Sequence, residues 1–131
     1  MIKKKPSEWA EEFLSYLEEC RTEYEKAYAV VGEEDKRLQD MLHALEFSPN
    51  KQERNKVATQ FQRSRKTRRK AKDEVMALEK IYNFWKDPQN KPILRRLKTL
   101  IPQQREREEY LEGDRHYIER MPTKGGGESG L

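Results

Sequence analysis

The sequence contains little of what most catalytic and metal-binding sites are built from. Its 131 residues include one cysteine and two histidines. No serine or cysteine stands at a motif spacing from a histidine, so a nucleophile paired with a base is not indicated. One thiol and two distant imidazoles are also too few for a zinc site. We therefore expect no enzymatic activity, no metal and no cofactor.

The few residues of these types fit structural roles. Cys20 lies among apolar residues at helical spacing, which favours a buried thiol, with a reactive thiol as the alternative. His43 and His116 are interpreted as partly exposed residues that bind no ligand. Because a second cysteine is missing, no disulfide forms within the chain, which indicates a reducing compartment and hence the cytoplasm.

Long apolar runs are missing as well. No run approaches the ~20 residues that cross a bilayer, and "MIKKKPSEWAEEF" has no apolar segment of the kind found in signal peptides. Charged residues make up 40% of the chain and apolar residues 34%. This balance is too polar for a thick globular core and too rich in aromatics and leucine for disorder. It suits long amphipathic helices.

Apolar residues at spacings of three and four predict a first helix over residues 7–46, with Ser7 as its N-cap. Gly32 is the weak point of this helix, which we expect to continue through it, with a bend there as the alternative. The apolar lane of this helix comprises Trp9, Phe13, Tyr16, Cys20, Tyr24, Ala27, Val31, Leu38, Met41 and Leu45.

A second helix is predicted over residues 49–86, with Ser48 as its N-cap and Pro49 at its first position. Its lane alternates strictly between spacings of four and three, as in a coiled coil. Two polar residues in the middle, Ser64 and Arg68, are expected to fix the register. The lane consists of Val57, Phe61, Ser64, Arg68, Ala71, Val75, Leu78, Tyr82 and Trp85.

The short connection between two helices of nearly equal length predicts an all-α, coiled-coil-like fold, a long antiparallel helical hairpin. Pairing around the turn is expected to bring together Leu38 with Val57, Cys20 with Val75, and Trp9 with Trp85.

A short third helix over residues 92–101 is expected to cover the open end of the hairpin, where the two tryptophans lie. Pro102 is expected to interrupt it before a polar helical segment, 103–112. Residues 1–121 would then form a single helical domain, and the glycine-rich residues 122–131 a flexible tail. Because a hairpin buries little apolar surface, a homodimer is also expected.

Positive charge is concentrated in one segment. Residues 47–72 carry ten bases and one acid, and "RSRKTRRKAK" (63–72) holds seven of those bases. Arg68 falls in the apolar lane, near Tyr24, Ala27 and Tyr28, and its guanidinium is expected to lie on a tyrosine ring. The block has two interpretations. It pairs with acids of the first helix, or its surplus attracts phosphate or an acidic protein surface.

On the second interpretation, the predicted binding residues for nucleic acid or an acidic partner are Arg63, Arg65, Lys66, Arg69, Lys70 and Lys72. The signal is not specific, since the chain has no helix-turn-helix, zinc-finger, RNA-recognition or phosphate-loop motif.

Four stretches resemble a recurrent group of small proteins in phages and prophages of Firmicutes. They are "QDMLHALE" (39–46), "ERNKVATQFQRSRKTRRKAKDEVMALEKIYNFW" (53–85), "NKPILRRLKTLI" (90–101) and "REREEYLEGDRHY" (105–117). The resemblance implies a phage context and carries no biochemical role for any residue. Small phage accessory proteins often bind and block a host machine, CRISPR nucleases included.

Three functional hypotheses follow. The leading one is a non-enzymatic, phage-encoded protein that docks its basic hairpin on a host nucleoprotein in the bacterial cytoplasm, with anti-CRISPR inhibition as its sharpest form. The second is direct binding of DNA or RNA. The third is a structural coiled-coil scaffold or assembly factor.

Overall fold

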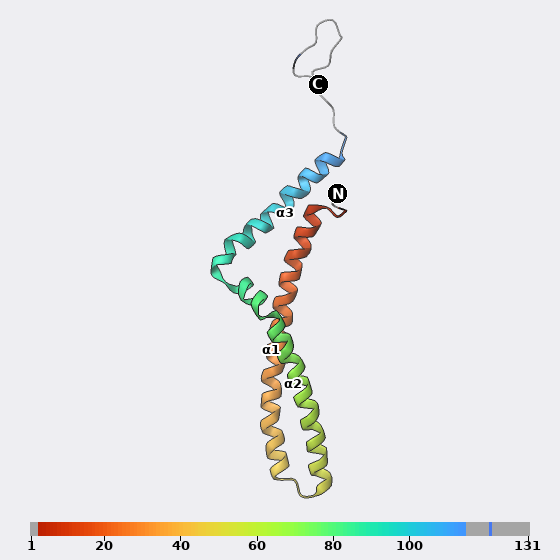
Figure 1. The fold of residues 1–131 in the computed structure, drawn as a ribbon, viewed down its shortest axis with the longest axis vertical. Helices are drawn as coiled ribbons and strands as arrows, with labels where there is room; N and C mark the ends of the chain where they lie inside the picture. The colour runs from red at the N-terminus through yellow and green to blue at the C-terminus, as the bar shows by residue number, and fades with distance from the viewer. Residues whose placement is uncertain (1–2, 115–120, 122–131) are drawn as a thin grey trace.

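The structure of the protein is a computed structural model, and it describes residues 3–114 and 121. The fold is all-α (Figure 1). Helix α1 (Pro6–Glu46) and helix α2 (Lys51–Lys86) pack antiparallel as a long hairpin. One turn of 3-10 helix, η1 (Pro88–Asn90), leads into a shorter third helix, α3 (Lys91–Glu112). The predicted fold class is confirmed.

Helix α1 is one unbroken helix of 41 residues, about 60 Å long. It continues through Gly32, where a Cβ atom would meet open space. The predicted N-cap is wrong, because the helix begins at Pro6, which suits the first turn since it has no N–H group to satisfy. The hydroxyl of Ser7 instead donates a hydrogen bond to Glu108 Oε1 at 2.5 Å.

Helix α2 begins two residues later than predicted, because Asn50 caps it in place of Ser48. The Asn50 side-chain oxygen accepts a hydrogen bond from the Glu53 N–H at 2.9 Å. Ser48 donates to the Ala44 carbonyl at 2.6 Å and so belongs to the end of α1. Both residue types are good N-caps, and the geometry of the turn selects the later one.

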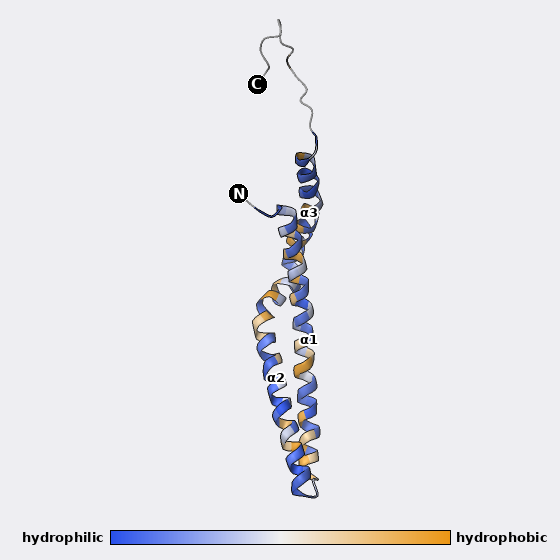
Figure 2. Ribbon diagram, turned by 90° about the vertical axis from the view of Figure 1, so that its right-hand side faces the viewer, coloured by the Kyte–Doolittle hydropathy of each residue, from blue (hydrophilic) through white to orange (hydrophobic). Residues whose placement is uncertain are grey.

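The seam of the hairpin, defined as the line of side chains that face each other between α1 and α2, buries few large side chains completely. Ala27, Val57 and Ala71 are its buried apolar members, and two polar residues are buried with them. Figure 2 shows that the ribbon of α2 is hydrophilic over most of its middle. The hairpin is therefore held by a thin core, as the composition indicates. Cys20 is buried, as predicted.

The register of the hairpin differs from the predicted one. The ring of Tyr24 stacks on that of Tyr82, with centroids 3.9 Å apart, and Arg68 Nε donates to Asp35 Oδ1 at 2.7 Å. Val75 lies two turns beyond Arg68, so it is level with the part of α1 about two turns before Asp35, and not with Cys20.

The predicted meeting of the two tryptophans is wrong for the same reason. Trp85 lies one turn from Tyr82 and hence near the level of Tyr24, whereas Trp9 lies about 20 Å further along α1. Near the turn, Val57 lines a shared groove with Met41, Leu42 and Leu45, which lie closer to the turn than the predicted partner Leu38.

Helix α3 is longer than predicted, since it runs without interruption through Pro102 to Glu112. Pro102 is exposed, so the carbonyl left without its usual backbone partner can face water. The helix turns back along the N-terminal half of α1, antiparallel to it (Figure 1). Leu94 and Ile101 are its buried residues. It does not cover Trp9 as predicted, because 56% of that side chain stays exposed.

Polar contacts fasten the far end of α3 to the start of α1. The Ser7 N–H and hydroxyl both donate to the Glu108 carboxylate, Lys5 Nζ lies 2.8 Å from Glu112 Oε1, and Arg105 pairs with Glu11. We call these three residue pairs the α1–α3 clasp. The Ser7 hydroxyl, above all, holds the pKa of Glu108 below its ordinary value.

Two sequence-based expectations fall where the structure gives no description. The predicted flexible tail, 122–131, and His116 lie outside the described residues. Among the helices that are described, none combines the length and the apolar character that crossing a membrane requires.

Candidate anion-binding groove

The seam divides the basic block of α2 between two sides of the hairpin. Ser64 and Ala71 are buried and face α1. Each residue of a helix is rotated by about 100° from its neighbour. The residues on either side of a seam position therefore point to opposite sides of the hairpin: residues 63 and 70 to one, residues 65 and 72 to the other.

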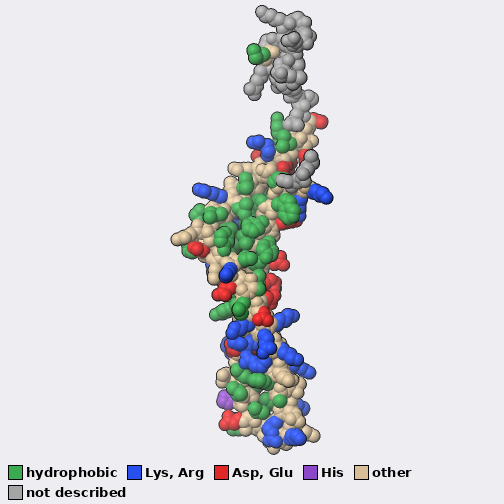
Figure 3. Space-filling view, in the orientation of Figure 1, with side chains coloured by type: hydrophobic (Ala, Val, Ile, Leu, Met, Phe, Trp, Pro, Cys, Tyr) green, Lys and Arg blue, Asp and Glu red, His purple; other side chains and the backbone are tan. Residues whose placement is uncertain are grey.

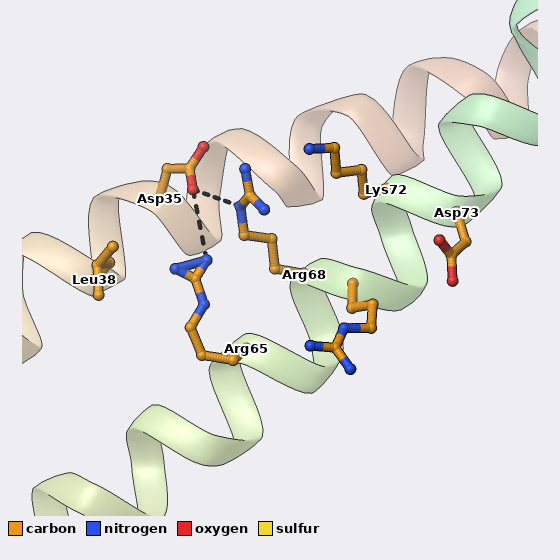
Figure 4. A pocket seen from close by; sticks show the side chains of 7 residues that line it. Asp35, Leu38, Arg65, Arg68, Lys72 and Asp73 are labelled. Atoms are coloured by element: carbon orange, nitrogen blue, oxygen red, sulfur yellow. Dashed lines mark hydrogen bonds and ion pairs between the residues drawn. The ribbon is translucent and has the colours of Figure 1, made fainter.

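One of these sides forms a groove of about 640 Å³ between α1 and α2, which we call the basic groove (Figure 4). It is lined by Asp35, Leu38, Arg65, Arg68, Arg69, Lys72 and Asp73. Four cations and two carboxylates leave it with a positive surplus. Three of the cations are arginines, whose planar guanidinium matches the geometry of phosphate and carboxylate oxygens.

Asp35 holds two of the arginines in place. Arg68 Nε lies 2.7 Å from its Oδ1 and Arg65 3.9 Å from the same oxygen. Figure 4 shows both side chains reaching from α2 toward Asp35 on α1. The Arg65 guanidinium also lies 5.9 Å from the centre of the Phe61 ring. The expected contact of Arg68 with a tyrosine ring is wrong, because the actual register brings a carboxylate to it instead.

Arg69 and Lys72 complete the groove and differ from these arginines. Both are exposed, and neither has an ion-pair partner among the described residues. The two therefore present charge that the chain itself does not neutralise. The spacing of Arg65, Arg69 and Lys72 covers two helical turns, a rise of about 10 Å.

The other predicted binding residues are not in this groove. Arg63 lines a second groove on the opposite side of the seam, with Arg37 and Asp40 among its neighbours. Lys70 is exposed and, by its position beside Ala71, points to that same side. Lys66 is exposed on the outer surface of α2 and lines neither groove. The predicted set is thus split, with Arg65, Arg69 and Lys72 brought together.

The sequence analysis missed a buried carboxylate beside the groove. Glu34 is only 4% exposed and accepts a hydrogen bond from the Ser64 hydroxyl at 2.5 Å across the seam. Arg37, one turn along α1, contributes a second contact at 3.3 Å. The clue in the sequence is spacing, because Glu34 falls three residues after Val31 and four before Leu38, at a seam position.

Metal-ligating side chains are not gathered in the described part of the chain. Across residues 3–114 and 121, no group of three or more histidine, cysteine or acidic side chains is arranged to hold a metal ion. His43 lies exposed in the last turn of α1. The arrangement of the basic groove is suited to binding an anion.

Comparison with known proteins adds no family, because no family model, curated protein or solved structure matches the chain.

Proposed function

We propose that the chain is a non-enzymatic binding protein whose basic groove binds the phosphate backbone of a nucleic acid. The observation that carries the proposal is the gathering of Arg65, Arg68, Arg69 and Lys72 along one side of the hairpin, with only Asp35 and Asp73 to oppose them. The row lies on one helix and Asp35 holds Arg65 and Arg68, so little backbone order remains to be imposed on binding.

Phosphate fits the groove better than a single carboxylate does. The row of cations rises by about 10 Å along α2, long enough to meet more than one phosphate of a strand, whereas a single carboxylate meets it at one point. Asp35 orients Arg65 and Arg68 and leaves further guanidinium N–H groups to donate. We expect contacts to the backbone and not to base edges, and hence little sequence preference.

The resemblance to phage and prophage proteins motivates the biological setting of the proposal. In that setting the nucleic acid belongs to a nucleoprotein of the bacterial host, and the bound hairpin blocks it. Inhibition of a CRISPR nuclease is the sharpest form of this hypothesis.

The proposal is tested with two double variants that reverse the same number of charges on opposite sides of α2. Arg69→Glu with Lys72→Glu alters the basic groove, and Arg63→Glu with Lys70→Glu alters the other side. None of the four side chains has an ion-pair partner among the described residues, so both proteins should keep wild-type helicity.

Binding is measured by fluorescence anisotropy with labelled single-stranded and duplex oligonucleotides at 50 mM salt. We expect the groove variant to bind about tenfold more weakly or worse, and the opposite-side variant to lose much less. Equal losses would mean that charge alone matters and that the groove is not the site. If the chain bound neither oligonucleotide but captured an acidic protein from nuclease-treated host lysate, the ligand of the groove would be a protein and not a nucleic acid.

A further inference from the structure

A second exposed surface lies at the other end of the molecule from the turn. Trp9, Phe13 and Tyr16 continue the seam side of α1 beyond the point where α2 ends. Helix α3 packs instead on the side of α1 that carries Ser7 and Leu17, which are both buried. The three aromatic side chains are thus part of an apolar lane that no described helix covers.

Helix α3 presents a matching lane. Ile93, Leu97 and Leu100 recur at spacings of four and three beside the buried residues Leu94 and Ile101. Figure 3 shows hydrophobic side chains gathered in one area over α3 and the N-terminal half of α1. We call these six residues the apolar face: Trp9, Phe13, Tyr16, Ile93, Leu97 and Leu100.

The apolar face is large for a monomer. Five of its members keep between 48% and 56% of their surface exposed, and Leu97 is partly covered. The three aromatics alone leave roughly 300 Å² exposed, since each offers about 200 Å² in all. Trp9 to Tyr16 and Ile93 to Leu100 each rise by about 10 Å, so the apolar face forms the centre of an interface, and the residues around it would supply the rest of the ~800 Å² that each partner contributes.

The charges at the edges of the apolar face indicate what covers it. On the outer edge of α1, Glu12 is paired with Lys4, whereas Glu19 has no ion-pair partner among the described residues. The outer edge of α3 carries Arg96 and Arg107. Glu19 on one edge and Arg96 on the other make the surface complementary to itself. A two-fold axis parallel to the long axis of the molecule would place α1 of each copy over α3 of the other. The edge that carries Glu19 in one copy would then meet the edge that carries Arg96 in the other.

Glu19 and Arg96 also lie at the same height along the two antiparallel helices. Arg105 pairs with Glu11 within one chain, which sets the two helices level at that point. Glu19 lies eight residues beyond Glu11 on α1, and Arg96 lies nine residues before Arg105 on α3. Both are thus about 12–14 Å from the Glu11–Arg105 pair, in the same direction. Neither has an ion-pair partner among the described residues.

We propose that a second copy of this chain docks on the apolar face to form a two-fold dimer in which Glu19 of each copy meets Arg96 of the other. The apolar lanes become buried between four helical segments. Such an interface is isologous, so each charge pair occurs twice. None of the six residues of the apolar face lines the basic groove.

Sedimentation equilibrium of the full chain between 1 and 100 μM tests the proposal. We expect twice the 15.8 kDa chain mass for the wild type and a monomer for Phe13→Glu with its helicity retained. Arg63→Glu, on the hairpin, is the control and should leave the dimer intact.

A charge exchange tests the arrangement itself. Glu19→Arg alone and Arg96→Glu alone each place like charges opposite each other twice, and each should weaken the dimer about tenfold or more. The double variant restores opposite charges and should recover most of the affinity. A wild-type monomer at 100 μM, a dimer that Phe13→Glu leaves unchanged, or a double variant no better than the single ones would overturn the proposal.

Discussion

At the residue scale, the buried Glu34 carboxylate and the Ser64 hydroxyl are the most specific contact of the hairpin. Alanines and valines in a seam fit many registers almost equally well, whereas a buried carboxylate requires its donor at one position. The pair therefore selects the register that brings Arg65 and Arg68 to Asp35. This is how a structural contact determines the geometry of the basic groove.

Removing the donor should cost stability. Ser64→Ala leaves the Glu34 carboxylate with Arg37 alone, and we expect the free energy of unfolding in urea to fall by about 1–2 kcal/mol. Adding Glu34→Leu to the Ser64→Ala chain removes the buried charge altogether and should recover most of the loss. Ser15→Ala, at an exposed site of α1, is the matched control. A Ser64→Ala chain as stable as this control would contradict the role given to the pair.

At the scale of elements, α1 has two partners in succession. Its turn-proximal part packs on α2, and its N-terminal part packs on α3. The two partners pack on different sides of α1. A single lane of apolar residues therefore predicts the packing of α1 on α2 near the turn and wrongly extends that packing to Trp9.

The α1–α3 clasp should weaken in acid. The pKa of Glu108 is lowered in the folded protein, chiefly by the Ser7 hydroxyl, from an ordinary value of 4.5. A lowered folded pKa means that the stabilisation is complete above about pH 4.5 and is lost as the pH falls through the folded value. The Ser7 amide proton, which donates to this carboxylate, should therefore shift in NMR spectra with a midpoint below 4.5.

Glu108→Gln supplies the control for this titration, because an amide does not ionise in this range and the step in the Ser7 signal should disappear. A midpoint at or above 4.5 in the wild-type protein would show that the carboxylate is not held by the Ser7 donors.

The helices themselves could be predicted from the sequence, since heptad spacing and turn residues are local signals. The start of α1 could not, because Ser7 is engaged by Glu108, which is distant in the sequence. The continuity of α3 through Pro102 was also missed. A proline removes one hydrogen bond but does not end a helix whose remaining turns are packed.

At the scale of the whole molecule, the described part of the chain is an extended rod with three zones of surface in order along one face (Figure 3). Figure 3 shows hydrophobic side chains near the turn, then Lys and Arg side chains on the hairpin, then the hydrophobic area over α3. The composition and the segregated charge predict a cationic surface that the acids of the chain do not neutralise. The division of the seven bases follows from Ser64 and Ala71, which the predicted lane already contained. Only the pairing of Arg65 and Arg68 with Asp35 depends on the register, which the sequence analysis placed wrongly.

The most direct test of the account counts phosphates. The logarithm of the affinity for a single-stranded oligonucleotide is measured against the logarithm of salt concentration for the wild type, for Arg69→Gln with Lys72→Gln, and for Arg63→Gln with Lys70→Gln. Each lost phosphate contact lowers the slope by ~0.7, so the groove variant should lose about 1.4 and the opposite-side variant almost nothing. Slopes that fall equally in both variants, or in neither, would contradict the claim that the hairpin binds nucleic acid through the basic groove.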